Sequence, residues 1–172
     1  DNQDDLAWSR RRDAVQRAVG DLNADILAFQ EMETFVGGSF NQTNRQLAWV
    51  LQHYPAYAVG AITEDAASFP NTQPILYRDE RFELVDQGWF FYSRTPDRIY
   101  SNTFNGGYPA FSTWVILEEI LSGNRLKVVN VHLDYASHTN RKKSADLILD
   151  RIRADLEEGL PVVLVGDFNV PW

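Results

Sequence analysis

The stretch VVLVGDFNVPW, residues 162–172, is the most informative part of the sequence for the fold. Four of the five residues from Val162 to Gly166 are apolar and three of them are valines, which predicts a buried strand. The strand gives way to Gly-Asp-Phe-Asn at 166–169, so an acid and an amide follow its carboxyl end. We therefore expect a functional site at this end of the strand.

The residues before this strand predict a β-α-β unit. A tight turn, LSGNRL (121–126), leads into a strand over RLKVVNVHLD (125–134). A helix is expected over 140–159, with Gly159 as its stop signal. Its buried face is expected to contain Ala145, Ile148, Leu149, Ile152 and Leu156.

The first part of the chain predicts the order helix, strand, helix. Ser9 is the expected N-cap of a helix over 10–22, and a turn at Asn23 leads to a short buried strand that ends at Gln30-Glu31. A second helix is expected from about Arg45 to His53, before Pro55. Short runs rich in aromatic and β-branched residues then predict strands at 56–62, 73–78, 82–92 and 110–120. This order predicts one α+β layered domain with helices on the outer faces of a mixed sheet system.

Composition limits the classes of function. The chain has 172 residues, of which 44% are hydrophobic, so one domain with a packed core is expected. The 16 Lys and Arg against 24 Asp and Glu give a formal charge of −8, which argues against broad electrostatic adhesion to nucleic acid or to an anionic membrane. An anionic substrate would then need positive charge at the site, such as a bound cation. Without cysteine, disulfides and thiolate metal sites are excluded, and no apolar run approaches the roughly 18 residues of a membrane span.

Three apolar strands end in polar residues that a purely structural strand does not need. If these strands share an edge, five candidate site residues gather there: Glu31, His132, Asp134, Asp167 and Asn169. Taken singly, each has a structural explanation. Glu31 suits a solvated strand end, His132 suits a hydrogen-bonded core position, and Asp167 with Asn169 suits an Asx turn.

Taken together, the three motifs match one pattern. In the order QE (30–31), NVHLD (130–134) and GDFN (166–169), they resemble the endonuclease/exonuclease/phosphatase superfamily, which includes pancreatic-type deoxyribonuclease, apurinic endonucleases, deadenylases, sphingomyelinases and inositol-polyphosphate 5-phosphatases. The resemblance implies a four-layer α/β/β/α sandwich of deoxyribonuclease-like fold, incomplete in this chain, with residues 1–172 forming a partial domain. It also covers WSRRRDAV (8–15), QPILYR (73–78), RFELVDQGWFFYSRTPD (81–97) and NRKKSADLIL (140–149).

The resemblance implies a divalent-metal-dependent hydrolase of phosphoester bonds. A phosphoester anion repels hydroxide, so hydrolysis needs a cation, a base for water and a donor for the developing charge. Glu31 would bind Mg²⁺ or Mn²⁺, and His132 would donate a hydrogen bond or a proton to the phosphate. Asp167 would orient or deprotonate water, and Asn169 would hold that water or a phosphate oxygen. Asp134 is expected to support these groups and not to react.

Some parts of the family pattern have no counterpart in the sequence. The family's first strand, with its Asn near the metal, and a late Asp-His motif are missing, so we expect a truncated portion, poorly soluble or partly folded and weakly active or inactive. His53 and His138 lie in the wrong segments to substitute for the late motif. Gln73 stands where many relatives have Asn, and Ala110 where many have Arg, which affects expected contacts with substrate.

The substrate stays open among nucleic acid, a phospholipid headgroup and a small phosphate ester, as does the choice between diester and monoester. The alternative function is a noncatalytic binding or scaffold member of the same fold, although the intact Glu31, His132, Asp167 and Asn169 argue against it. For the full-length protein, in contrast to the isolated portion, we expect a soluble monomer without a transmembrane segment. Because the chain starts at Asp1 and not at Met, a removed signal peptide would make the protein secreted or periplasmic.

Three other stretches have both a functional and a structural explanation. The basic run Arg10 to Arg12 is expected to be a solvated helix face. TFNGGYPAF (103–111) could present an aromatic lip of Phe104, Tyr108 and Phe111 that stacks a base or touches lipid, and a packed connection between strands is favoured. ETFVGGSF (33–40) could border the site in the same way.

Overall fold

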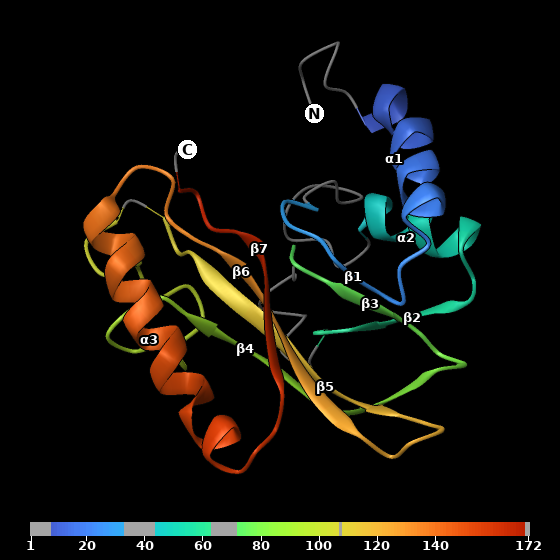
Figure 1. Cartoon of the computed structure of the whole chain (residues 1–172). Coiled ribbons are helices and arrows are strands. Elements are labelled where there is room, and N and C mark those ends of the chain that lie inside the picture. Colours follow the sequence, from blue (N-terminus) through green and yellow to red (C-terminus); the bar gives the residue numbers. More distant parts are fainter. Residues whose placement is uncertain (1–7, 33–43, 63–71, 107, 171–172) are drawn as a thin grey trace.

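The computed structural model describes residues 8–32, 44–62, 72–106 and 108–170. Both expected helices of the first part and the long helix near the end are present, as are the expected strands (Figure 1). None of the helices in the described part of the chain has the length and apolar character that a membrane span requires. The elements are α1 (Trp8–Leu22), β1 (Ile26–Ala28), α2 (Arg45–His53), β2 (Tyr57–Gly60), β3 (Ile75–Arg78), β4 (Phe82–Phe91), β5 (Phe111–Glu119), β6 (Arg125–His132), α3 (His138–Glu157) and β7 (Val162–Asp167).

The strands form two sheets. The smaller sheet has the order β1-β3-β2 and is antiparallel throughout. The larger sheet has the order β4-β5-β6-β7, in which β6 and β7 are parallel and the other pairs antiparallel. The parallel pair follows from the connection through α3, because a helix that crosses between two strands returns the chain in the same direction.

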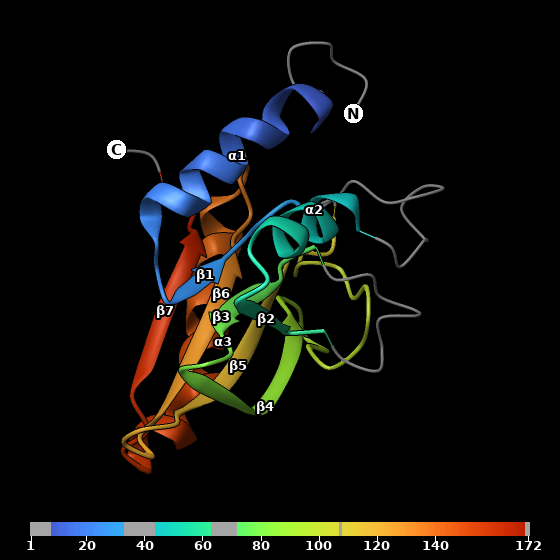
Figure 2. The same cartoon turned by 90° about the vertical axis from the view of Figure 1, so that its right-hand side faces the viewer.

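The sheets pack face to face between two helical layers, which confirms the expected four-layer sandwich (Figures 1 and 2). On β6, Val128 packs in the core between the sheets, whereas Val129 and Val131 pack under α3. This alternation follows from the two-residue period of a strand. On the other side, Val19 of α1 and Val50 of α2 share a cluster with residues of the smaller sheet. Even-numbered residues of β6 therefore face the smaller sheet, and this orientation places the site.

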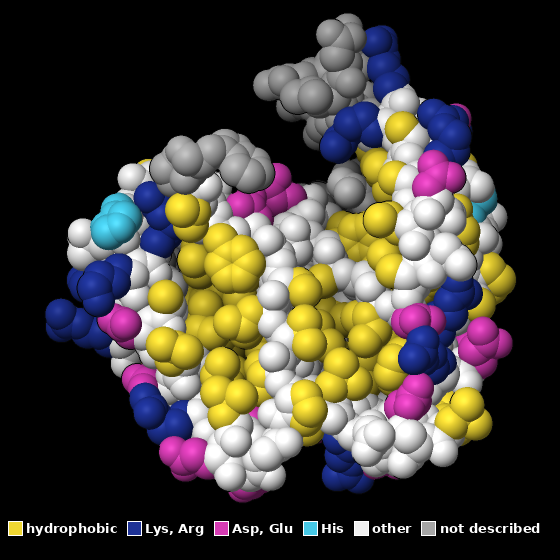
Figure 3. Space-filling view, in the orientation of Figure 1, with side chains coloured by type: hydrophobic (Ala, Val, Ile, Leu, Met, Phe, Trp, Pro, Cys, Tyr) yellow, Lys and Arg dark blue, Asp and Glu magenta, His cyan; other side chains and the backbone are white. Residues whose placement is uncertain are grey.

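Three local expectations are wrong. Ser9 is the second residue of α1 and not its N-cap, because the helix begins at Trp8. The strand β7 is not buried: it pairs, among the described strands, with β6 alone, and Val163 and Leu164 are exposed. On α3, the buried face consists of Asn140, Ser144, Ile148 and Ile152, so the expected Ala145, Leu149 and Leu156 are exposed. Figure 3 shows apolar side chains on the surface in this view of the larger sheet and α3.

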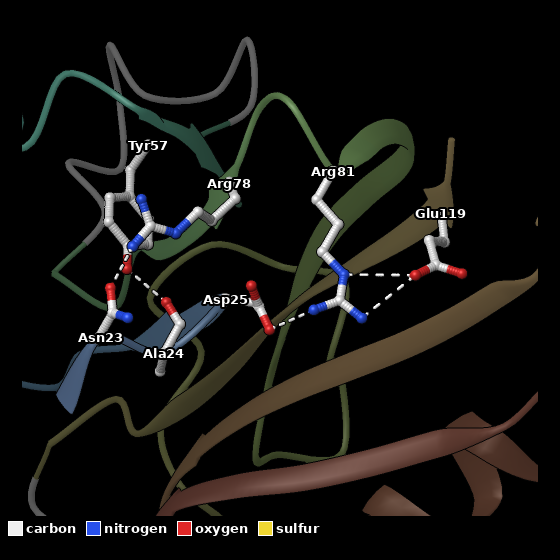
Figure 4. A network of polar contacts seen from close by, with 7 residues as sticks. All are labelled: Asn23, Ala24, Asp25, Tyr57, Arg78, Arg81 and Glu119. Atoms are coloured by element: carbon white, nitrogen blue, oxygen red, sulfur yellow. Dashed lines mark hydrogen bonds and ion pairs between the residues drawn. The ribbon is translucent and has the colours of Figure 1, made fainter. Parts of the chain in front are cut away.

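A polar network joins the two sheets near the start of β1 (Figure 4). Arg81, in the turn between β3 and β4, binds both Asp25, which precedes β1, and Glu119 at the end of β5. Beside it, Arg78 donates to Asn23 and lies over the ring of Tyr57. Because Asp25 and Glu31 flank opposite ends of β1, this network lies away from the candidate site.

Candidate active site

The ends of β1, β6 and β7 meet at one rim between the two sheets. A cavity of about 340 Å³ opens there, within the size range of small-molecule sites. Four of the five predicted residues line it: Glu31, His132, Asp167 and Asn169. They come from three segments that are far apart in the sequence, so the fold brings together the groups that the motifs predicted.

His132 and Asp167 are paired positions on the parallel strands β6 and β7. Leu133 N–H donates to the Asp167 carbonyl at 2.9 Å, which continues the ladder beyond His132. His132 lies on the even-numbered face of β6, which faces the smaller sheet, and its side chain is 18% exposed. The pairing therefore fixes an imidazole and a carboxylate side by side at the cavity.

Glu31 approaches this pair from the smaller sheet. Its Oε1 lies 3.8 Å from His132 Nε2, and its side chain is 72% exposed. Its φ of 56° is in the left-handed region, which is uncommon for a residue other than glycine and often marks a functional turn. Directly after it, Met32 N–H donates to the Thr72 carbonyl at 3.0 Å, so the turn is held against the neighbouring segment.

Asn169 closes the cavity after β7. Its N–H donates to Asp167 Oδ1 at 2.8 Å, so the Asx turn expected as a structural explanation is present beside the functional arrangement. Its Nδ2 donates to the Leu133 carbonyl at 2.7 Å. An amide nitrogen carries two hydrogens, so this bond orients Asn169 and leaves a donor and the Oδ1 acceptor for a ligand.

Asp134 lies apart from these four residues. It is buried and accepts hydrogen bonds from Asn140 Nδ2 at 2.8 Å and from the backbone N–H groups of Ala136 and Ser137 at 2.8 and 3.0 Å. Burial alone would raise the pKa of Asp134, but these donors outweigh it, with help from the charge of Arg141, and the pKa lies below its usual value. Asp134 thus anchors the loop that follows His132.

A polar bridge that the motifs did not predict lies beneath the cavity. Asn130 is fully buried on the same face of β6 as His132. Its Oδ1 accepts from Gln30 Nε2 at 2.6 Å, and its Nδ2 donates to the Phe29 carbonyl at 2.8 Å. The bridge joins the larger sheet to the residue next to Glu31. A lone amide within the valine-rich run of β6 was the available signal.

The two departures from the family pattern are both at this site. Gln73 and Ala110 line the cavity and are buried. Gln73 Nε2 donates to the carbonyls of Phe111 and Asn130, at 3.1 and 3.4 Å. Gln73 therefore also connects the two sheets under the site.

The stretch 103–111 is a packed connection, as favoured, and it also borders the cavity. Phe104 and Tyr108 pack against the core under α3, and Tyr108 and Phe111 line the cavity. Burial raises the pKa of the Tyr108 hydroxyl, and the Asp134 carboxylate adds to this effect. Arg10 and Arg11 are exposed on α1, and Arg12 lies over the ring of Trp49. The stretch 33–40 lies outside the described residues.

The side chains at the rim fit a hard divalent cation. Mg²⁺ prefers oxygen ligands and is usually held by one or two carboxylates together with waters and substrate oxygens. Glu31 and Asp167 supply two carboxylates to one cavity, and the exposed Glu31 side chain leaves room for water. No group of three or more His, Asp or Glu side chains suited to enclosing an ion occurs within the described residues.

Comparisons with known proteins identify the family and the fold of the chain. The model of the Endonuclease/Exonuclease/phosphatase family matches residues 1–172. A CCR4-Not complex 3'-5'-exoribonuclease subunit from Phaeosphaeria nodorum is 28% identical over 142 residues, which are 74% of this chain and 23% of the relative. A mannosyl-6-phosphatase from Bacteroides thetaiotaomicron has a TM-score of 0.81 at 25% identity, covering 99% of this chain and 62% of that structure. An endonuclease/exonuclease/phosphatase family protein from the same species has a TM-score of 0.78 at 26% identity, covering 95% and 56% of the two chains. The chain thus spans less than two thirds of the length of each of these relatives.

Proposed function

Because the chain belongs to the endonuclease/exonuclease/phosphatase family, we propose that its rim cavity binds a phosphoester and hydrolyses it with the help of Mg²⁺ or Mn²⁺. The observation that carries this proposal is the arrangement of Glu31, His132, Asp167 and Asn169 around one cavity. An imidazole, two carboxylates and an amide can supply the base, the cation ligand and the hydrogen-bond donors that assist phosphoester hydrolysis.

His132 and Asp167 have complementary tasks in this proposal. Asp167 orients the attacking water and accepts its proton, since a carboxylate next to the cavity is a suitable general base. His132 donates a hydrogen bond or a proton to the phosphate, where negative charge increases as the reaction proceeds. Their paired positions on β6 and β7 hold the two groups at a fixed spacing.

Glu31 holds the cation, which would supply positive charge to the phosphate oxygens when bound. Asn169 holds the water or a phosphate oxygen through the part of its amide that Leu133 does not use. Asp134 maintains the loop after His132 and does not touch the substrate. Each predicted residue therefore has one role, and a substitution of that residue tests the role separately.

The relatives suggest two types of substrate. Their names describe one as an exoribonuclease subunit and another as a mannosyl-6-phosphatase, so one acts on RNA and the other on a sugar phosphate. RNA is cleaved at a diester, and a sugar phosphate is a monoester. Both substrates are phosphoesters, and the proposal at this level covers them both.

The test is hydrolysis of bis-p-nitrophenyl phosphate and p-nitrophenyl phosphate by the full-length protein, with Mg²⁺, Mn²⁺ or EDTA. Asp167→Ala and His132→Ala are compared with the wild type, and Asp146→Ala serves as a matched control because it removes an exposed carboxylate on α3. We expect metal-dependent turnover that falls at least about 100-fold in both site variants and is unchanged in the control.

The two substrates separate diester from monoester preference. Turnover in EDTA, or turnover that survives both site substitutions, would overturn the proposed mechanism. A well-folded protein that binds phosphate and metal at this site but hydrolyses neither ester would favour the noncatalytic scaffold function.

A further inference from the structure

Two tyrosine rings are stacked at the mouth of the cavity. The rings of Tyr108 and Tyr135 have centroids 6.1 Å apart and planes within 22° of parallel. Tyr108 is partly buried, whereas Tyr135 is 72% exposed. A large aromatic side chain gains little from burial in such a position, so core packing does not explain Tyr135.

The tyrosine pair separates two cavities. Both rings line the cavity that contains Glu31, His132, Asp167 and Asn169. Both also line a second cavity of about 450 Å³. A ligand with its phosphate among the site residues would therefore have the aromatic pair next to it, with a further space on the other side of the rings.

The second cavity has several polar residues in its lining. Asn105, Ser137 and Asn140 line it, together with Asp134, Gly106 and Ala136. Amide and hydroxyl groups both donate and accept hydrogen bonds. This lining suits the edge of a nitrogen heterocycle better than it suits an acyl chain.

The loop that carries Tyr135 is held in place by its backbone. Arg141 Nη1 donates to the carbonyls of Asp134 and Tyr135, at 2.9 and 3.1 Å. The Asp134 carboxylate accepts hydrogen bonds from the backbone N–H groups of Ala136 and Ser137, which follow Tyr135 in the chain. The Tyr135 ring is thus presented from an ordered backbone, which reduces the entropy lost on binding.

We infer that Tyr108 and Tyr135 form a base-stacking platform and that the substrate is a phosphoester that carries a nucleobase. The inference rests on the proposed function, because it places the reacting phosphate among His132, Asp167 and Asn169. A planar base extends the parallel stack that the two rings begin, and stacking on an aromatic side chain tolerates any base. The second cavity then receives the edge of the base or the next nucleotide.

The charge of the chain does not distinguish a nucleotide from an anionic lipid. A formal charge of −8 opposes electrostatic adhesion to nucleic acid and to an anionic membrane alike, so the choice of a nucleobase rests on the aromatic pair, because stacking requires no net positive charge. Specific recognition of single-stranded nucleic acid generally uses exposed aromatic side chains in this way.

The test is a binding comparison that does not depend on turnover. Adenosine 5'-monophosphate and ribose 5-phosphate differ only in the base, and their affinities are measured by calorimetry with Mg²⁺ in the Asp167→Ala background, which blocks the proposed reaction. We expect the adenine nucleotide to bind about 5- to 150-fold more tightly, the range for one base on an aromatic ring. Adding Tyr135→Ala should remove most of this preference and leave ribose 5-phosphate unchanged, whereas Tyr135→Phe should keep it.

Each other outcome overturns the inference. Equal affinities for the two ligands, no measurable binding of either, or an equal loss for both in Tyr135→Ala would show that Tyr135 does not stack a base. Mannose 6-phosphate that binds more tightly than the nucleotide, with a loss in Tyr135→Ala, would assign the platform to a sugar ring. The binding test and the hydrolysis test can fail separately. A protein that prefers the adenine nucleotide but hydrolyses neither ester contradicts the proposed function alone.

Discussion

Gly166 on β7 lies so close to Val131 on β6 that a Cβ atom at Gly166 would come within 2.0 Å of the Val131 carbonyl oxygen. The φ of Gly166 is 129°, a conformation that residues with a Cβ rarely adopt. Asp167 follows directly, so the close approach of the two strands determines where its carboxylate lies. The glycine in GDFN thus has a backbone role in placing the Asp167 carboxylate.

Gly166→Ala is expected to move β7 away from β6, to lower the free energy of unfolding by about 3 kcal/mol and to abolish turnover. The matched control is Gly123→Ala, since Gly123 also has a positive φ, of 69°, but nothing lies within 4 Å of its missing Cβ. This control should cost about 1–2 kcal/mol and keep the kcat of the wild type. Urea unfolding and steady-state kinetics check both variants, and similar kinetics for the two would contradict the role of Gly166.

Asn130→Ala is expected to weaken the metal dependence of the reaction as well as stability. The substitution leaves Gln30 Nε2 and the Phe29 carbonyl without their partner, at a cost of about 1–3 kcal/mol, and loosens the segment before Glu31. The Mg²⁺ concentration at half-maximal rate should rise about tenfold. Thr113→Val is the control, because Thr113 bonds the Gln73 carbonyl in the same buried layer without touching Gln30. A Mg²⁺ requirement unchanged in Asn130→Ala would show that the bridge is structural only.

Elements with a strong local pattern could be predicted from the sequence. The helix Arg45–His53 and the unit from β6 to β7 have apolar spacing and turn residues that depend on neighbours along the chain. The site followed from the same information, since polar residues after apolar strands collect where strand ends meet. The exposure of β7 could not be predicted, because an edge strand and a central strand can have the same valine-rich composition.

Contacts between distant segments also could not be predicted. Asn130 and Gln30 lie 100 positions apart, and the residues between them contain no mark of their pairing. Tyr135 resembles any exposed loop tyrosine until its ring is seen beside Tyr108. Such pairs depend on how the two sheets and their loops are placed, which is a property of the whole fold.

Asp134→Asn is expected to reduce stability at neutral pH and to have less effect in acid. The folded state lowers the pKa of Asp134, so the carboxylate stabilises the fold fully above its unfolded pKa, about 3.9, and loses this contribution as the pH falls through the lower folded value. The variant cannot titrate, and whichever way its amide turns, an N–H₂ group faces a donor that the carboxylate accepted. Free energies of unfolding from urea titrations at pH 7 should differ by about 1–3 kcal/mol, and the difference should shrink below about pH 4.

The exposed Asp146→Asn is the control for this pH series, and it should follow the wild type at every pH. A difference between Asp134→Asn and the wild type that stays constant from pH 7 into the acid range would contradict a lowered pKa at Asp134.

Lys127 and Asp155 form an ion pair. We expect its loss to destabilise the protein most while leaving kcat unchanged. Lys127 Nζ lies 2.6 Å from Asp155 Oδ2, both side chains are largely buried, and the ammonium lies over the ring of Trp114. Lys127→Ala leaves Asp155 as an unpaired charge in a largely buried position, so the free energy of unfolding should fall by about 3–5 kcal/mol. Lys127 is paired with Val162, at the opposite end of β6 and β7 from His132 and Asp167, and kcat should therefore not change.

Arg81→Ala provides the contrast for an exposed ion pair. Its partners Asp25 and Glu119 are solvated, so the loss should be about 1 kcal/mol or less, again without effect on kcat. The double variant Lys127→Met with Asp155→Leu should recover most of the stability lost in Lys127→Ala, because it removes both buried charges together. Equal losses for Lys127→Ala and Arg81→Ala, or no recovery in the double variant, would show that the cost at Lys127 comes from lost packing and not from the stranded carboxylate.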